Sequence, residues 1–139
     1  MCIRDSRVGS GFDLVIAKNV LKRGMVHPRE PVDALRRVDL GVSDDRFLEA
    51  IARALRPGGL FAIYNLSPRV EPGAPYTPHA DGACPFTRAQ LEQSGFEVRE
   101  HDATDTEGVT AMAHALGWDA LLGMAPETDI VSSVTIARR

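Results

Sequence analysis

Long apolar segments, blocks of basic residues and clustered cysteines are all missing from this sequence of 139 residues. No apolar run approaches the ~20 residues that a membrane-spanning helix needs, and the N-terminus lacks the apolar core of a signal peptide. The net charge is −3, and no Lys/Arg block of the kind that binds nucleic acid interrupts the mixture of charges. We therefore expect a soluble cytoplasmic protein without a membrane or nucleic-acid partner. Its oligomeric state stays open.

Metal-ligand and disulfide patterns are also missing. The two cysteines, Cys2 and Cys84, are far apart, and no Cys-x-x-Cys or His-Glu-x-x-His spacing occurs. We expect no metal site and no disulfide framework. Cys84 is expected to be an inert thiol, because no basic partner lies near it in the sequence.

What the chain does contain is an ordinary globular composition, with 44% hydrophobic and 25% charged residues. Its length suits one domain. The opening string Met-Cys-Ile-Arg-Asp-Ser does not fit the rest and reads like translated adapter sequence. We expect residues 1–10 to be a non-native leader and residues 11–139 to form the domain.

The first half alternates strand and helix patterns. Residues 12–17 form an apolar run with β-branched side chains, typical of a strand buried on both faces of a parallel sheet, and Lys18 and Asn19 end it. Residues 47–55 carry apolar side chains on one helical face, behind N-capping residues at 43–45. The turn Pro57-Gly58-Gly59 stops this helix, and residues 60–65 read as a second buried strand.

The second half begins with an irregular segment, residues 67–85, whose prolines exclude regular structure and whose length indicates a functional or mobile loop. Thr87 caps a predicted helix over 88–94, and strands are predicted over 96–101 and 128–137. A helix is predicted over 107–122, with these inward side chains: Val109, Met112, Ala113, Leu116 and Leu121. Together the pattern predicts an α/β sheet, mostly parallel, with an antiparallel last strand.

Residues 12–19, the helix, Pro-Gly-Gly and strand run over 47–65, and the closing segments around 86–98 and 134–138 resemble the later part of class I S-adenosylmethionine-dependent methyltransferases. The resemblance implies a partial Rossmann-like methyltransferase sheet, beginning at the family's fourth strand. The family's glycine-rich cofactor loop and its ribose-binding acidic residue would lie upstream of residue 11. The resemblance therefore implies that the chain is the C-terminal half of a domain and is inactive by itself.

The resemblance also assigns a site. Lys18 and Asn19, at the end of the first strand, would face S-adenosylmethionine bound by the complete parent protein, and His27 would act as the catalytic base for the acceptor. Tyr64, Asn65 and the proline-rich loop would wall the pocket of a small-molecule substrate. The methyl acceptor is not identified.

Three alternatives remain. Lys18 and Asn19 are also compatible with a plain solvated strand end, and His27 with a surface histidine beside Pro28. The second hypothesis is a non-catalytic α/β binding or interaction domain that keeps half of a sheet and pairs through its exposed edge. Another nucleotide-binding enzyme, such as a reductase, is disfavoured because neither Gly-x-Gly-x-x-Gly nor Tyr-x-x-x-Lys is present.

Overall fold

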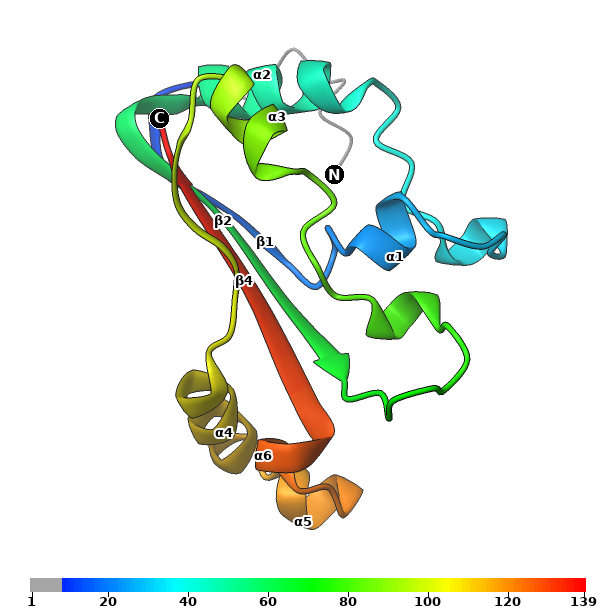
Figure 1. Ribbon diagram of the computed structural model, residues 1–139. Coiled ribbons are helices and arrows are strands. Elements are labelled where there is room, and N and C mark those ends of the chain that lie inside the picture. Colours follow the sequence, from blue (N-terminus) through cyan, green and yellow to red (C-terminus); the bar gives the residue numbers. More distant parts are fainter. Residues whose placement is uncertain (1–8) are drawn as a thin grey trace.

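A computed structural model describes residues 9–139 of the chain, so most of the expected leader lies outside the described residues. The described part has an α/β fold built on one sheet in the order β1-β2-β4-β3 (Figure 1). Its strands are β1 (Phe12–Lys18), β2 (Leu55–Pro68), β3 (Glu97–Ala103) and β4 (Ile130–Arg138). β1 and β2 are parallel, and β4 is antiparallel to both of its neighbours, β2 and β3. The predicted fold class and the reversed last strand are confirmed.

The helices surround this sheet and follow local signals in the sequence. Their bounds are α1 (Arg23–Val26), α2 (Asp44–Ala54), α3 (Arg88–Gln93), α4 (Thr106–Ala115), α5 (Trp118–Leu122) and α6 (Pro126–Asp129), with 3-10 turns at Ala34–Arg36 and Pro78–Ala80. The Ser43 hydroxyl accepts the Arg46 N–H at the start of α2, and Thr87 forms a capping box with Gln90 at the start of α3. Among the described residues, no helix is both long and apolar enough to span a bilayer.

The boundary between α2 and β2 differs from the prediction. The Pro-Gly-Gly turn lies inside β2, which begins at Leu55, opposite Phe12 of β1. Gly58 adopts φ +80°, and its N–H donates to the Arg139 carbonyl at 2.7 Å. The end of β4 thus supplies a pairing partner for this segment, which local turn signals do not reveal.

The predicted long helix over 107–122 was wrong in its second half. Gly117 takes a left-handed conformation with φ +68° and separates α4 from α5. Val109 and Ala113 are buried as expected, but Leu116 and Leu121 are 52% and 77% exposed. The break turns the second half away from the sheet.

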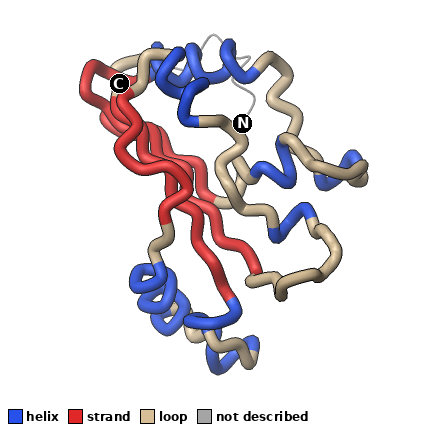
Figure 2. The backbone as a smooth tube through the Cα atoms, in the orientation of Figure 1, coloured by secondary structure: helices blue, strands red, loops and turns tan. Residues whose placement is uncertain are grey.

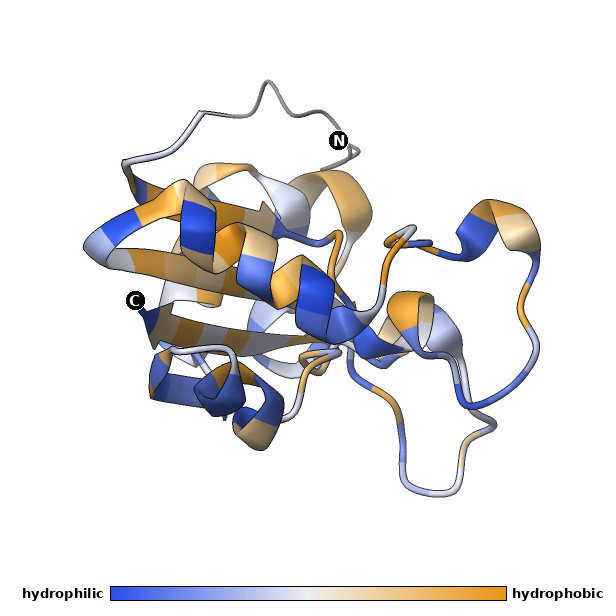
Figure 3. Ribbon diagram, turned by 90° about the horizontal axis from the view of Figure 1, so that it is seen from above, coloured by the Kyte–Doolittle hydropathy of each residue, from blue (hydrophilic) through white to orange (hydrophobic). Residues whose placement is uncertain are grey.

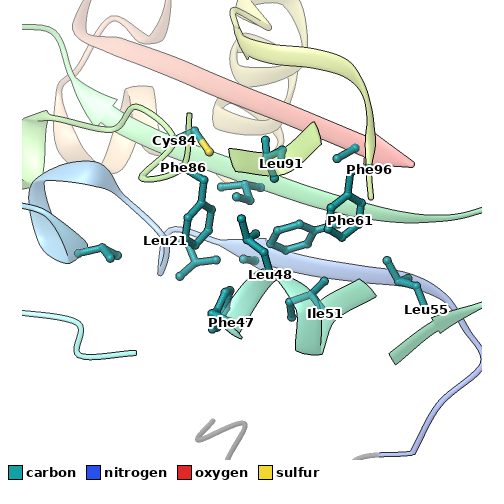
Figure 4. Packing of buried hydrophobic residues seen from close by; sticks show 14 residues of the cluster. Leu21, Phe47, Leu48, Ile51, Leu55, Phe61, Cys84, Phe86, Leu91 and Phe96 are labelled. Carbon is teal, nitrogen blue, oxygen red and sulfur yellow. The ribbon is translucent and has the colours of Figure 1, made fainter. Parts of the chain in front are cut away.

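One face of the sheet carries the main core, which we call the covered face. α2 and α3 bury it through Phe47, Leu48, Ile51 and Leu91 (Figure 4). The Phe47 and Phe86 rings stack with centroids 5.6 Å apart. Burying each such side chain contributes about 1.5–3 kcal/mol. This layer is the principal hydrophobic support of the fold.

The other face, which we call the open face, is covered only in part. At one end α4 packs over a small cluster of Leu66, Val109 and Ile130. Toward the edge strand β1, Leu14 and Ile16 remain 52% and 60% exposed. Figure 3 shows apolar residues along strands of the sheet, while the helices mix polar and apolar residues. Apolar strand residues therefore reach solvent on this side.

Candidate functional site

The carboxyl ends of β1 and β2 form the polar region of the sheet where the predicted site lies. The two strands are parallel neighbours, with Lys18 opposite Tyr64, and the Asn19 N–H donates to the Tyr64 carbonyl at 3.0 Å. The loops that follow them lie side by side (Figure 2), because the Arg23 N–H donates to the Ala83 carbonyl at 2.8 Å. In open α/β sheets, ligands bind outside such strand ends.

Asn19 takes a specific conformation at the end of β1. Its φ is +60°, a left-handed value that asparagine tolerates better than most residues. The side-chain oxygen accepts the Leu66 N–H at 2.7 Å and so ties the β1 end to β2. Among the described residues, the side-chain NH₂ group has no recorded partner. Asn19 can therefore accept a backbone hydrogen bond through Oδ1 and still donate one to a ligand through its NH₂ group.

Lys18 points elsewhere. Its ammonium lies 3.5 Å from the Met112 sulfur of α4, on the open face of the sheet. Lys18 and Asn19 are adjacent in sequence, yet their recorded contacts are with different elements. The structure thus places both at the strand end without joining their side chains.

Lys22 is a candidate that the sequence reasoning missed. It is buried, and its ammonium donates to the Leu66 carbonyl and, at 3.4 Å, to the His79 carbonyl. No carboxylate among the described residues forms an ion pair with it. Burial lowers the pKa of the Lys22 ammonium from its ordinary value. No sequence signal marked this residue, because lysine after a strand is usually solvated.

Asn65 and Tyr64 hold the site together from β2. Asn65 is fully buried and donates to the carbonyls of Leu21 at 2.8 Å and Gly82 at 2.9 Å, so it joins the two loops from beneath. Tyr64 donates to the Asp105 carboxylate at 3.2 Å. Burial, with the Asp105 charge second, raises the pKa of Tyr64. Both residues act as supports in this structure.

His27 has no hydrogen bond to Asn19, Lys22 or Asn65 in the part of the chain that the structure describes. It is exposed at the end of α1, and its Nε2 lies 2.9 Å from the Asp44 carboxylate at the start of α2. Gln90 donates to the same carboxylate at 3.2 Å. The role of His27 as a base stays a prediction.

Cys84 is buried beneath the same loops. Burial raises the pKa of its thiol to about 11, which keeps it protonated and unreactive near neutral pH. This agrees with the predicted inert thiol. Within residues 9–139, no group of three or more His, Cys, Asp or Glu side chains is arranged to hold a metal ion.

No protein-family model and no curated protein sequence matches the chain. Among solved structures it is similar to the [4+2]-cyclase SpnF, with 16% identity and a TM-score of 0.46 over 100% of this chain and 53% of that one. An S-adenosylmethionine-dependent methyltransferase from Mesorhizobium loti gives 18% and 0.43, over 94% and 63%. Phosphoethanolamine N-methyltransferase 2 from Haemonchus contortus, in complex with S-adenosyl-L-methionine, gives 15% and 0.40, over 92% and 33%. The chain thus spans less than two thirds of each, and likenesses this distant carry no information about what it binds.

Proposed function

We propose that this chain is the C-terminal half of a class I S-adenosylmethionine-dependent methyltransferase, whose complete form methylates an acceptor that is not yet identified. The observation that carries the proposal is the juxtaposition of Asn19, Lys22 and Asn65 at the carboxyl ends of two parallel strands. The reversed last strand, which the pattern of predicted strands and helices indicated, supports it.

The residues present fit one side of the cofactor. The NH₂ group of Asn19 is a donor suited to its carboxylate. The Lys18 ammonium is a second donor at the strand end, but it lies beside the Met112 sulfur and does not point toward the same group. No Gly-x-Gly-x-Gly turn follows a strand within residues 9–139, so the backbone cradle for the rest of the cofactor has to come from another segment. When bound, the cofactor supplies an electrophilic methyl group on a sulfonium. The chain's own residues orient the partners and accept the acceptor's proton.

Two residues are candidates for that proton. Lys22 is supported by its position among the strand-end residues and by its lowered pKa, which increases the neutral, basic fraction. His27 follows from the sequence resemblance, with its ring beside Asp44. We expect Lys22→Arg to lower kcat of the complete enzyme about 100-fold with KM little changed, because arginine keeps the charge and cannot act as a base. If His27→Gln produces that loss instead, the role belongs to His27.

Cofactor binding tests the proposal directly. We expect isothermal titration of the isolated chain with S-adenosylmethionine to give weak or no binding, since only one wall of the site is present. Micromolar binding would contradict the half-site. In the complete protein, Asn19→Asp keeps the acceptor for the Leu66 N–H and tolerates the left-handed φ, and removes the donor. It should weaken cofactor binding about tenfold, while Asp13→Asn at the opposite end of β1 leaves binding unchanged.

A second candidate function is a non-catalytic interaction domain. The exposed apolar residues Leu14 and Ile16 on the edge strand β1 favour it, because an unpaired edge with apolar side chains readily pairs with another chain. A natural start codon preceded by a stop in the source DNA would support this function. A reading frame that continues upstream into a strand and a glycine-rich loop would support the methyltransferase.

A further inference from the structure

A cavity of about 410 Å³ with a mixed polar and apolar lining lies beyond the carboxyl ends of β2 and β3, beside the start of β4. None of the strand-end residues Lys18, Asn19 and Lys22 lines it. Its polar wall includes Ser67, Arg69, Asp81, Asp102, Thr104 and Ser133. The cavity therefore adjoins the site described above, with which it shares the loop residues Gly82 and Ala83, but its charged side chains are different ones.

Asp102 is held at this cavity by a local distortion of β3. The pairing of β3 with β4 is irregular between Glu100 and Ala103, and Asp102 takes a left-handed φ of +53°. Its Oδ1 accepts the Cys84 N–H and the Ser133 hydroxyl, each at 2.6 Å. Among the described residues, Oδ2 has no hydrogen-bond donor, and His101 Nδ1 lies 3.8 Å away. Bulges of this kind redirect a side chain and are common at functional sites.

The hydroxyl of Ser67 is a second unused group at this wall. Ser67 is 6% exposed, and its Oγ has no hydrogen-bond partner among the described residues. Gly82 leaves room for it, because a Cβ at that position would come within 2.1 Å of the hydroxyl oxygen. A buried polar atom without a partner is unfavourable, so this wall of the cavity carries an unsatisfied hydroxyl behind its accessible charged groups.

The charges at the cavity have opposite signs at different places. Arg69 donates through Nε to the Thr128 carbonyl, at 2.5 Å, and forms no ion pair with a described carboxylate. Asp81 is already neutralised by Arg23, at 2.8 Å. Asp102 and Arg69 therefore remain as the negative and positive groups available to a ligand.

We propose that this cavity binds a small zwitterion of the amino-acid class. Its ammonium group donates to Asp102 Oδ2, and its carboxylate accepts from the outer nitrogens of Arg69. Charge-assisted hydrogen bonds of this kind are stronger than neutral ones. The site does not depend on methyl transfer and can be tested in the chain as it stands.

Three small probes of similar size test separately what the ammonium and the carboxylate of the ligand contribute to binding. Titration of the ¹⁵N-labelled chain with L-alanine should give saturable amide shifts at residues 67–70, 80–83 and 131–133. L-lactate, which has a hydroxyl in place of the ammonium, and isopropylamine, which lacks the carboxylate, should each bind about tenfold more weakly. Equal shifts with alanine and lactate, or no saturable shift in these segments with alanine at about 100 mM, would overturn the proposal.

Variants then test the two charged residues. Asp102→Asn keeps an oxygen for Cys84 and Ser133 and suits the left-handed φ, so it changes the charge with little change in structure. It should weaken alanine binding about tenfold, and Arg69→Gln should weaken it about as much. Asp119→Asn, remote from the cavity, is the matched control and should bind like the wild type. Unchanged affinity in Asp102→Asn would refute the site. If that variant does not fold, Arg69→Gln and the probe series on the wild type decide.

Discussion

On the covered face of the sheet, Phe61 and Ile63 of β2 lie under α2 and α3 and are each 1% exposed. On the open face, Leu14 and Ile16 of β1 and Leu60 of β2 are 38–60% exposed. The side chains on the two faces are equally apolar, so the difference lies in what covers them. Helices connect consecutive strands over one face, and α4 reaches only the far end of the other.

This comparison indicates where stability and where recognition reside in the chain. Apolar area removed from water contributes about 25 cal/mol per Å², and the covered face accounts for most of it here. Contiguous exposed apolar residues contribute little to the isolated fold and are typical of surfaces that meet another segment or chain. Both functions considered above require such a surface on β1.

The largest expected difference between the two faces can be measured at two adjacent residues, Phe61 on the covered face and Leu60 on the open face. We expect Phe61→Ala to lower the free energy of unfolding by about 3–5 kcal/mol, because it leaves a cavity beside Phe96, whose ring centroid is 6.1 Å away. Leu60→Ala should cost less than about 1 kcal/mol. Urea unfolding measures both. Similar losses for the two variants would show that the open face is also buried in solution.

The small cluster under α4 should behave like the covered face on a reduced scale. Val109 is 2% exposed, and Val109→Ala should cost about 2 kcal/mol in the same assay. Leu116, at the end of α4 and 52% exposed, is the control, with an expected change within about 0.5 kcal/mol for Leu116→Ala. A larger loss at Leu116 would show that its side chain is buried in solution, as the longer helix predicted from the sequence requires.

A charged substitution on β1 tests whether the open face mediates self-association. We expect the chain to self-associate through β1, and Ile16→Lys to reduce this association while changing the free energy of unfolding by less than about 0.5 kcal/mol. Sedimentation velocity over a concentration series measures the first quantity. Glu49→Gln, on the exposed side of α2, changes the net charge by the same +1 and is the control. A monomeric wild type would contradict the expectation.

The smallest expected effect concerns the segment that partly covers the open face. His114 of α4 lies 3.1 Å from both Asp119 and Glu127, and these hydrogen bonds raise the pKa of His114 above its ordinary value of 6.5. The raised pKa means that this interaction stabilises the fold fully below pH 6.5 and is lost as pH rises through the folded-state pKa.

An NMR titration of the His114 ring should therefore give a midpoint above 6.5, and Asp119→Asn should lower it. Glu127→Gln should lower it as well. An unchanged midpoint in both variants would mean that these contacts do not persist in solution. Because the His114 side chain is 48% exposed, we expect salt to weaken the shift.

Much of the fold follows from local patterns. The apolar run over 12–17 and the caps at Ser43 and Thr87 each marked an element that the structure contains, because these signals act over one or two turns of chain. The expectation that residues 12–17 are buried on both faces was wrong, because β1 is largely exposed at the edge of the described sheet. The Gly117 break and the early start of β2 were missed. The start of β2 depends on pairing with β1, far away in the sequence, whereas the break at Gly117 is a local left-handed glycine that the helical pattern of apolar residues outweighed in the prediction.

The candidate site divides in the same way. Lys18 and Asn19 were found from their place after a strand, whereas the burial of Lys22 arises from carbonyls at Leu66 and His79, which only the folded loops bring to it. Asp102 likewise meets Ser133 across the β3–β4 pair.

By itself, the sequence determined the α/β class, the direction of the last strand and the polar end of β1, because strand and helix periods are written into neighbouring residues. Only the tertiary structure decided which face of the sheet is covered and which polar side chains are buried. Those properties depend on long-range contacts, and apolar side chains that alternate along a strand look alike in the sequence whichever face they occupy.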